Sequence, residues 1–136
     1  SFIMLDNTLT LSVDTTNDGS PEDQTVTRFD SLQDRSIYKF ENDTYVVRDM
    51  LNFYRTVPKR NGNSLGVKKS AFKLTQDQVV PGVDETTTRT APALLDVSFA
   101  LPVGTTAAAA MVLRQRAIAL LDDDAFIERL TNNLEY

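Results

Sequence analysis

Residues 45–76 read YVVRDMLNFYRTVPKRNGNSLGVKKSAFKLTQ and carry the clearest periodic pattern in the chain. Apolar and polar residues alternate on both sides of the segment at residues 60–64. That segment contains Asn61-Gly62, and Asn-Gly is the strongest short-range signal for a β-hairpin. The pattern predicts two long antiparallel strands, Tyr45 to Val57 and Leu65 to Gln76, joined by a tight turn.

The same stretch differs from the rest of the chain in its charge. No acidic residue occurs between Asp49 and Asp77, although the net charge is −5 and residues 1–50 hold ten acids against four bases. The bases between these two aspartates are Arg55, Lys59, Arg60, Lys68, Lys69 and Lys73. A basic sheet on an acidic protein predicts contact with a polyanion on one face only.

The alternation also sorts this hairpin into two faces. The apolar face carries Val47, Leu51, Phe53, Val57, Phe72 and Leu74. The opposite face is polar and basic, and its candidate ligand-contacting residues are Arg48, Asn52, Tyr54, Thr56, Lys69, Lys73 and Thr75. One interpretation is an ordinary solvated sheet face. The other is a surface that tracks phosphates, on which Lys and Arg neutralise phosphates while Asn, Thr and Tyr reach sugars and bases.

Further strands are predicted on both sides of this hairpin. Alternation within Phe2 to Val13 is clear from Thr8 onward, and a polar loop from Asp14 to Asp23 leads to a second strand, so these two strands form an N-terminal hairpin. Asp84 to Thr90 is predicted to be a Thr-rich loop. The other predicted strands are Thr25 to Phe29, Ile37 to Phe40 and Ala93 to Val103, the last with Leu95, Val97, Phe99 and Leu101 on its apolar side.

The period then changes to that of helices. Ala107 to Leu121 is rich in alanine and follows Thr106, a good N-terminal cap, so it predicts a first helix. Three aspartates, Asp122 to Asp124, are unfavourable at the end of one helix but favourable at the start of another, so a second helix is expected from about Ala125 to Leu134. The chain is thus predicted to be one α+β domain over residues 1–136. An antiparallel sheet of about six strands, an N-terminal hairpin plus a meander, is followed by two helices.

The first predicted helix is apolar over more than half of its circumference. Ala110, Leu113, Ala117 and Leu120 form one stripe, and further apolar residues flank it. Such a helix favours burial on several sides, which predicts an interlocked homodimer with each chain's helices over the partner's sheet. A solvent-exposed alanine-rich helix is the alternative.

The composition excludes several classes of function. Hydrophobic residues make up 41% and charged residues 24%, as is usual for a soluble globular protein, and there is no Cys or His. This excludes a disulfide framework, a Cys/His zinc site and any nucleophile–imidazole pair. A carboxylate enzyme would have to use Asp122 to Asp124, which helix capping explains better. We therefore expect no enzyme activity, catalytic residue, metal or cofactor.

No segment suggests contact with a membrane. No apolar run approaches the ~20 residues that span a bilayer. No signal peptide is visible, because the apolar segment Phe2 to Leu5 is too short. We expect synthesis in the cytosol and no membrane partner.

The order of these predicted elements resembles the coat proteins of single-stranded RNA bacteriophages (levivirus-like). The segments most similar to that family are residues 70–80, SAFKLTQDQVV, and residues 96–106, DVSFALPVGTT. The resemblance covers nearly the whole chain and lies in order, length and local pattern.

The resemblance implies an intertwined homodimer that assembles into an icosahedral shell around genomic RNA. The inner sheet face would bind RNA through the seven polar-face residues named above, and in known members it also represses translation through one RNA hairpin. The segment Gly82 to Ala91 would gather around the symmetry axes. A minor maturation protein would be a further partner, and the protein would be made in the bacterial host cytoplasm and reside in the virion capsid. A non-assembling dimeric RNA-binding regulator is the alternative function.

Overall fold

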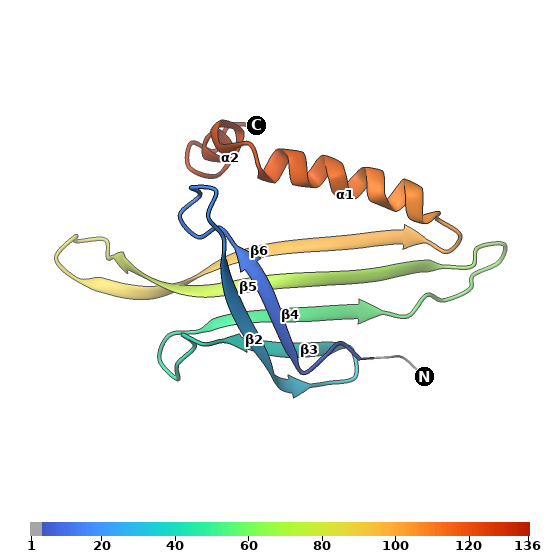
Figure 1. Ribbon diagram of the computed structural model, residues 1–136, viewed down its shortest axis with the longest axis horizontal. Helices are drawn as coiled ribbons and strands as arrows, with labels where there is room; N and C mark the ends of the chain where they lie inside the picture. Colours follow the sequence, from blue (N-terminus) through green and yellow to red (C-terminus); the bar gives the residue numbers. More distant parts are fainter. Residues whose placement is uncertain (1–3) are drawn as a thin grey trace. The chain divides into compact units, whose positions relative to one another are not determined.

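The structure is a computed structural model that describes residues 4–136 (Figure 1). Residues 1–3, where the alternating segment Phe2 to Val13 begins, lie outside the described residues. Six strands form one antiparallel sheet in sequence order, and two helices follow, which confirms the predicted α+β fold. The elements are β1 (Thr8–Val13), β2 (Glu22–Ser31), β3 (Arg35–Phe40), β4 (Asp49–Thr56), β5 (Val67–Pro81), β6 (Thr88–Pro102), α1 (Ala107–Leu121) and α2 (Asp124–Thr131).

Several predicted boundaries were wrong. The strand β5 continues to Pro81, five residues beyond the predicted Gln76, and α2 ends at Thr131 rather than at about Leu134. Tyr45 to Arg48 form a loop rather than the start of β4, because the Thr44 hydroxyl accepts the Val47 amide at 2.9 Å and competes with strand pairing. The last strand begins at Thr88, inside the segment predicted to be a Thr-rich loop.

The described residues fall into two compact units. The first comprises residues 4–58 and Lys68–Ala100, and the second comprises Lys59–Val67 and Leu101–Tyr136. The expectation of a single domain over residues 1–136 stays a prediction.

The core of the first unit lies on the predicted apolar face of the sheet. Val26 and Tyr38 are fully buried and Leu51 is 4% exposed. Tyr38 pairs with Leu51 across β3 and β4, and Leu51 pairs with Leu74 across β4 and β5, so these three side chains share one face. Around this core pack Leu9, Leu11, Phe40, Phe53, Phe72 and Leu74. The register therefore confirms that Leu51, Phe53, Phe72 and Leu74 of the predicted apolar set face the core. Val57 is instead 52% exposed, and Val47 lies in the loop before β4.

The β1–β2 hairpin completes this core. Figure 1 shows its two strands crossing the meander at a steep angle, and Leu9 and Leu11 of β1 pack against the buried cluster. Tyr38 secures the segment that enters the hairpin, because its hydroxyl donates to the Asp6 carbonyl at 2.6 Å and accepts from Arg28 at 2.7 Å. Arg28 also donates to the Leu5 carbonyl.

The second unit contains both helices and the turn between β4 and β5. The Asn61–Ser64 bridge confirms the predicted Asn-Gly turn. The turn also needs Gly66, since its φ is +97° and a Cβ there would lie 2.6 Å from the Lys59 carbonyl oxygen. Both helix caps are confirmed: Thr106 accepts the Ala109 amide at 3.2 Å, and Asp123 accepts the Phe126 amide at 3.1 Å.

Neither helix buries a residue. Large apolar side chains of α1 are about half exposed, among them Met111 at 50%, Leu113 at 55% and Leu120 at 51%. No helix among the described residues is long and apolar enough to cross a bilayer.

Candidate nucleic-acid interface

The antiparallel register of β4 and β5 assembles the predicted polar face. Residue pairs across these two strands are Asn52 with Lys73, Thr56 with Lys69, Tyr54 with Ala71 and Met50 with Thr75. Because side chains alternate between the two faces of a strand, all of these residues lie opposite the Leu51 and Phe53 core face. The structure thus brings together six of the seven predicted site residues on one face of two adjacent strands.

The two lysines of this face carry charges that no acid balances within the described residues, and we call such charges open. Neither Lys69 nor Lys73 forms an ion pair with any residue in the range 4–136. They lie four residues apart on β5, which corresponds to about 13 Å along a strand. Two open charges at that spacing suit an extended anionic chain better than a single small anion.

Asn52 supplies an unused hydrogen-bond acceptor beside Lys73. Its amide nitrogen lies 3.4 Å from the Tyr54 hydroxyl. Its Oδ1 is buried and has no hydrogen-bond partner among the described residues. A buried acceptor without a partner is unfavourable by about 1–3 kcal/mol, and a rotation of the Asn52 side chain toward a donating ligand would relieve this cost. Alternation in the sequence places Asn52 on this face, but only the three-dimensional structure reveals the unpaired oxygen.

Thr75 occupies the same face but is enclosed. It is 7% exposed, so it offers a ligand little surface in the single chain. Thr56, near the Lys69 end, is exposed, and Tyr54 and Asn52 are half-buried. The accessible part of the face therefore runs from Asn52 and Lys73 toward Thr56 and Lys69.

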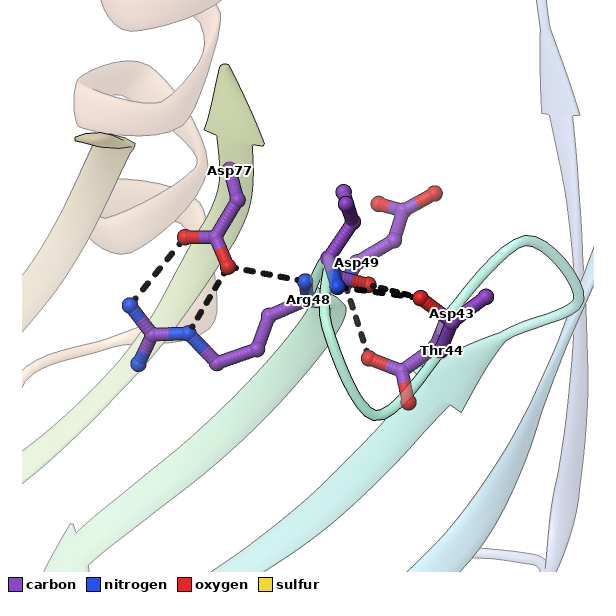
Figure 2. Close-up of polar contacts among 6 residues, drawn as sticks. Asp43, Thr44, Arg48, Asp49 and Asp77 are labelled. Atoms are coloured by element: carbon purple, nitrogen blue, oxygen red, sulfur yellow. Dashed lines mark hydrogen bonds and ion pairs between the residues drawn. The ribbon is translucent and has the colours of Figure 1, made fainter. Parts of the chain in front are cut away.

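Arg48, the seventh predicted site residue, is held by an acid (Figure 2). Its guanidinium contacts both carboxylate oxygens of Asp77, at 3.1 and 3.2 Å, and its backbone amide donates to the same carboxylate at 2.8 Å. The hydrogen bond from Arg48 is the main reason that the pKa of Asp77 lies below its ordinary value. The charge of Arg48 is therefore balanced within the chain, unlike those of Lys69 and Lys73.

A second group of charges at the start of β4 is only partly balanced, because Asp49 forms no ion pair among the described residues. Asp43 accepts the Asp49 amide at 2.8 Å and forms an ion pair with Lys39 at 3.4 Å. Burial, followed by the nearby charge of Asp43, raises the pKa of Asp49. The sequence analysis missed Asp43 and Asp77. The sequence holds one signal for Asp77, because it is the first acid after the acid-free stretch. In the register that pairs Asp49 with Gln76, the next residues on the two strands are Arg48 and Asp77.

Other chemistry finds little support in the described part of the chain. Within residues 4–136 no group of three or more His, Cys, Asp or Glu side chains could hold a metal ion. In the only run of three acids, Asp123 accepts the Phe126 amide at 3.1 Å and Asp124 lies in the first turn of α2. As predicted, the start of a second helix explains Asp123 and Asp124, whereas Asp122 lies at the C-terminal end of α1.

Comparison with known proteins adds information at the level of structure. No protein-family model matches the sequence, and no curated protein is similar to it in sequence. Among solved structures, the virus-like particle of Beihai levi-like virus 32 matches at a TM-score of 0.70 and 19% identity, covering 83% of this chain and 88% of that one. The virus-like particle of bacteriophage AVE019 matches at 0.69 and 19% identity, covering 93% of this chain and 94% of that one.

This chain has the fold of the proteins that form those particles. The likeness persists where sequence similarity is almost absent. The virus-like particle of bacteriophage ESE058 shares 8% identity, yet it matches at a TM-score of 0.68 over 95% of this chain and 96% of that one. Nearly complete coverage of both chains means that the whole fold, the sheet with its two C-terminal helices, corresponds.

Proposed function

We propose that this chain is the coat protein of a single-stranded RNA phage, a structural protein that self-assembles into a closed shell around RNA. The observation that carries the proposal is the likeness of its whole fold to subunits of virus-like particles of levi-like viruses and bacteriophages. The open lysines of the polar face support the RNA part of the proposal, because they give the inside of a shell a cationic lining.

The building block in this proposal is an interlocked homodimer with each chain's helices over the partner's sheet. Two unsatisfied apolar surfaces support it. The helices bury none of their residues, and the first unit retains a hollow of about 440 Å³ whose lining includes Phe53, Phe72 and Phe99. Burying the exposed half of a leucine-sized side chain contributes about 1 kcal/mol, so several such residues would hold a dimer together.

The RNA contact in this proposal runs along β4 and β5. Lys69 and Lys73 neutralise phosphates, Tyr54 offers a ring for stacking, and Asn52 Oδ1 accepts from a base amino group or a 2′-hydroxyl. Thr56 lies beside Lys69 within reach of sugars. Arg48 has a smaller direct share because Asp77 already balances its charge. Repression of translation through one RNA hairpin is the further role that this surface would serve.

Assembly is tested by size-exclusion chromatography of the recombinant chain, followed by electron microscopy of the leading peak and its absorbance at 260 and 280 nm. Uniform round particles with a nucleic-acid spectrum are the expected result. A dimer that binds RNA but forms no particles under several salt conditions would favour the second candidate, a non-assembling RNA-binding regulator. A monomer free of nucleic acid would contradict both.

The RNA surface is tested by replacing Lys69 and Lys73 together with alanine. We expect RNA affinity to fall several-fold to tenfold at moderate salt, and the slope of log affinity against log salt to flatten by about 1.4, about 0.7 per lost contact with a single strand. Lys68→Ala is the matched control, since this neighbouring lysine of β5 has the opposite parity. Equal losses of binding free energy per charge removed, in the control and in the double variant, would show that general charge, rather than this face, governs binding.

A further inference from the structure

The loop between β3 and β4 presents two apolar side chains to solvent. Tyr45 is 104% exposed and Val46 is 76% exposed, so neither side chain contributes to the core of its own chain. Single exposed apolar residues are common on protein surfaces. Here a fully exposed aromatic residue is followed directly by an exposed valine at one end of the sheet.

Hydrogen bonds fix the conformation of this segment, residues 43–49, which we call the Tyr45 loop. The Thr44 amide donates to the Val47 carbonyl at 2.9 Å, and the Val47 amide donates to the Thr44 hydroxyl at 2.9 Å. The loop is tied to the sheet at its C-terminal side by the contacts of Arg48 with Asp77 and of Asp49 with Asp43 (Figure 2). A loop held in one shape loses little conformational entropy when it binds.

The charges around the Tyr45 loop indicate which kind of partner suits it. Arg48 is paired with Asp77, and Lys39 is paired with Asp43. The segment around Tyr45 and Val46 therefore offers no open cation to a phosphate, in contrast to Lys69 and Lys73 at the other end of the polar face. A preorganised tyrosine with no open cation beside it suits a protein–protein contact, where tyrosine is enriched and acts as an anchor.

We infer that the Tyr45 loop docks onto another copy of this chain and forms a contact between neighbouring dimers of the shell. The inference rests on the proposed coat function and deepens it, because a closed shell needs contacts between copies beyond those that hold each dimer together. Val79 supports this location: it is 66% exposed and lies on β5 two residues beyond Asp77, so the same end of the sheet carries a third unburied apolar side chain. Tyr45 and Val46 are the anchors of this contact, and Arg48 and Asp77 are its positioning residues.

The test compares Tyr45→Ser with Tyr45→Phe and Val57→Ser in the full chain. We expect Tyr45→Ser to lower the yield of particles about tenfold or more and to leave folded dimers, with the melting temperature and RNA affinity of the unsubstituted dimer. Tyr45→Phe keeps the ring and should assemble. Val57→Ser removes a valine that is 52% exposed after the other end of β4 and should also assemble.

Each other outcome overturns the inference. Normal particle yield from Tyr45→Ser would show that the loop makes no necessary contact. Loss of RNA affinity with normal particles would assign the loop to RNA, and unfolding of the dimer would assign Tyr45 to the fold. If the unsubstituted chain forms no particles, the coat function itself is wrong and the contact is wrong with it. If the unsubstituted chain and all three variants form particles equally well, the coat function stands but the contact through the Tyr45 loop is wrong.

Asp77→Asn provides a second measurement of the same contact. It removes the charge that holds Arg48 and leaves Tyr45 itself unchanged. We expect particle yield to fall by a few-fold, less than for Tyr45→Ser, and to recover at higher protein concentration because the anchor is still present. An unchanged yield would show that the ion pair between Arg48 and Asp77 does not position the Tyr45 loop for this contact.

Discussion

The centre of the sheet and the two helices use apolar residues in opposite ways. In the first unit Val26 and Tyr38 are fully buried, and aromatic and aliphatic side chains from β1 to β5 pack around them. In the second unit α1 is apolar along most of its length and α2 carries Phe126 and Leu130, yet neither helix buries a residue. Apolar residues therefore form a self-contained core in one region and an unsatisfied surface in the other.

This difference teaches which parts of the fold one chain can stabilise alone. Each buried core residue of the sheet contributes about 1.5–3 kcal/mol through interactions within its own chain. The helices obtain their order from caps and from the helix propensity of alanine, while most of their apolar area remains for another surface. In the proposed dimer that surface is the partner's sheet.

Tyr38→Ala should have the largest effect, because it empties the centre of the core. The ring is fully buried and packs edge-on against Phe53 with centroids 5.4 Å apart. We expect a loss of about 3–5 kcal/mol in the free energy of unfolding, measured by denaturant titration. Tyr38→Phe, which loses only the hydroxyl contacts to Asp6 and Arg28, should lose about 1 kcal/mol. If both variants were near-neutral, the sheet would not be the self-contained region.

Leu113→Asp tests whether the exposed apolar surface of α1 is buried in a dimer. Leu113 is 55% exposed in the single chain, so a monomer would tolerate the change to within about 0.5 kcal/mol. In the proposed dimer it places a charge in an apolar interface, and we expect dimer affinity to fall by about 2 kcal/mol or more, measured by sedimentation at several concentrations. Gln115→Asp on the same helix is the control. Equal behaviour of the two variants would argue against helix-mediated dimerisation.

Asp123→Ala should have a moderate effect restricted to the helices. Asp123 accepts the Phe126 amide at 3.1 Å as the cap of α2. We expect a loss of about 1 kcal/mol in stability, with faster amide exchange at the start of α2 and unchanged exchange in β3 to β5. Asp123→Asn should keep most of the stability, since asparagine also caps helices. Faster exchange throughout the sheet would mean that the two regions unfold as one.

The smallest expected effect is the contribution of the Arg48–Asp77 pair to the loss of stability at acid pH. Arg48 lowers the pKa of Asp77 in the folded chain, so the stability from this pair is complete above the ordinary carboxyl pKa and is lost as the pH falls through the folded value. The raised pKa of Asp49 acts in the opposite sense. We expect Asp77→Asn to show a smaller drop in melting temperature between pH 6 and about pH 2.5 than the unsubstituted chain. An identical drop would locate the acid sensitivity elsewhere.

Much of this architecture followed from local sequence patterns. Period-two alternation predicted the order of the strands and the two faces of β4 and β5, and the register confirms both. Alanine content, Thr106 and the run Asp122 to Asp124 predicted both helices, with α1 correct at each end and α2 three residues shorter than expected at its C-terminal end. These features depend on neighbours within a few residues, so the sequence alone determined them.

The features that decide the candidate interface depend on contacts between distant residues. The 29-residue separation of Arg48 and Asp77, the unpaired Oδ1 of Asn52 and the placement of Tyr45 in a braced loop all arise from how strands pair and side chains pack. Alternation assigns a residue to a face, but it does not show which partner reaches that residue across the sheet. The sequence by itself thus determined the faces, and only the tertiary structure decided which charges on them are open.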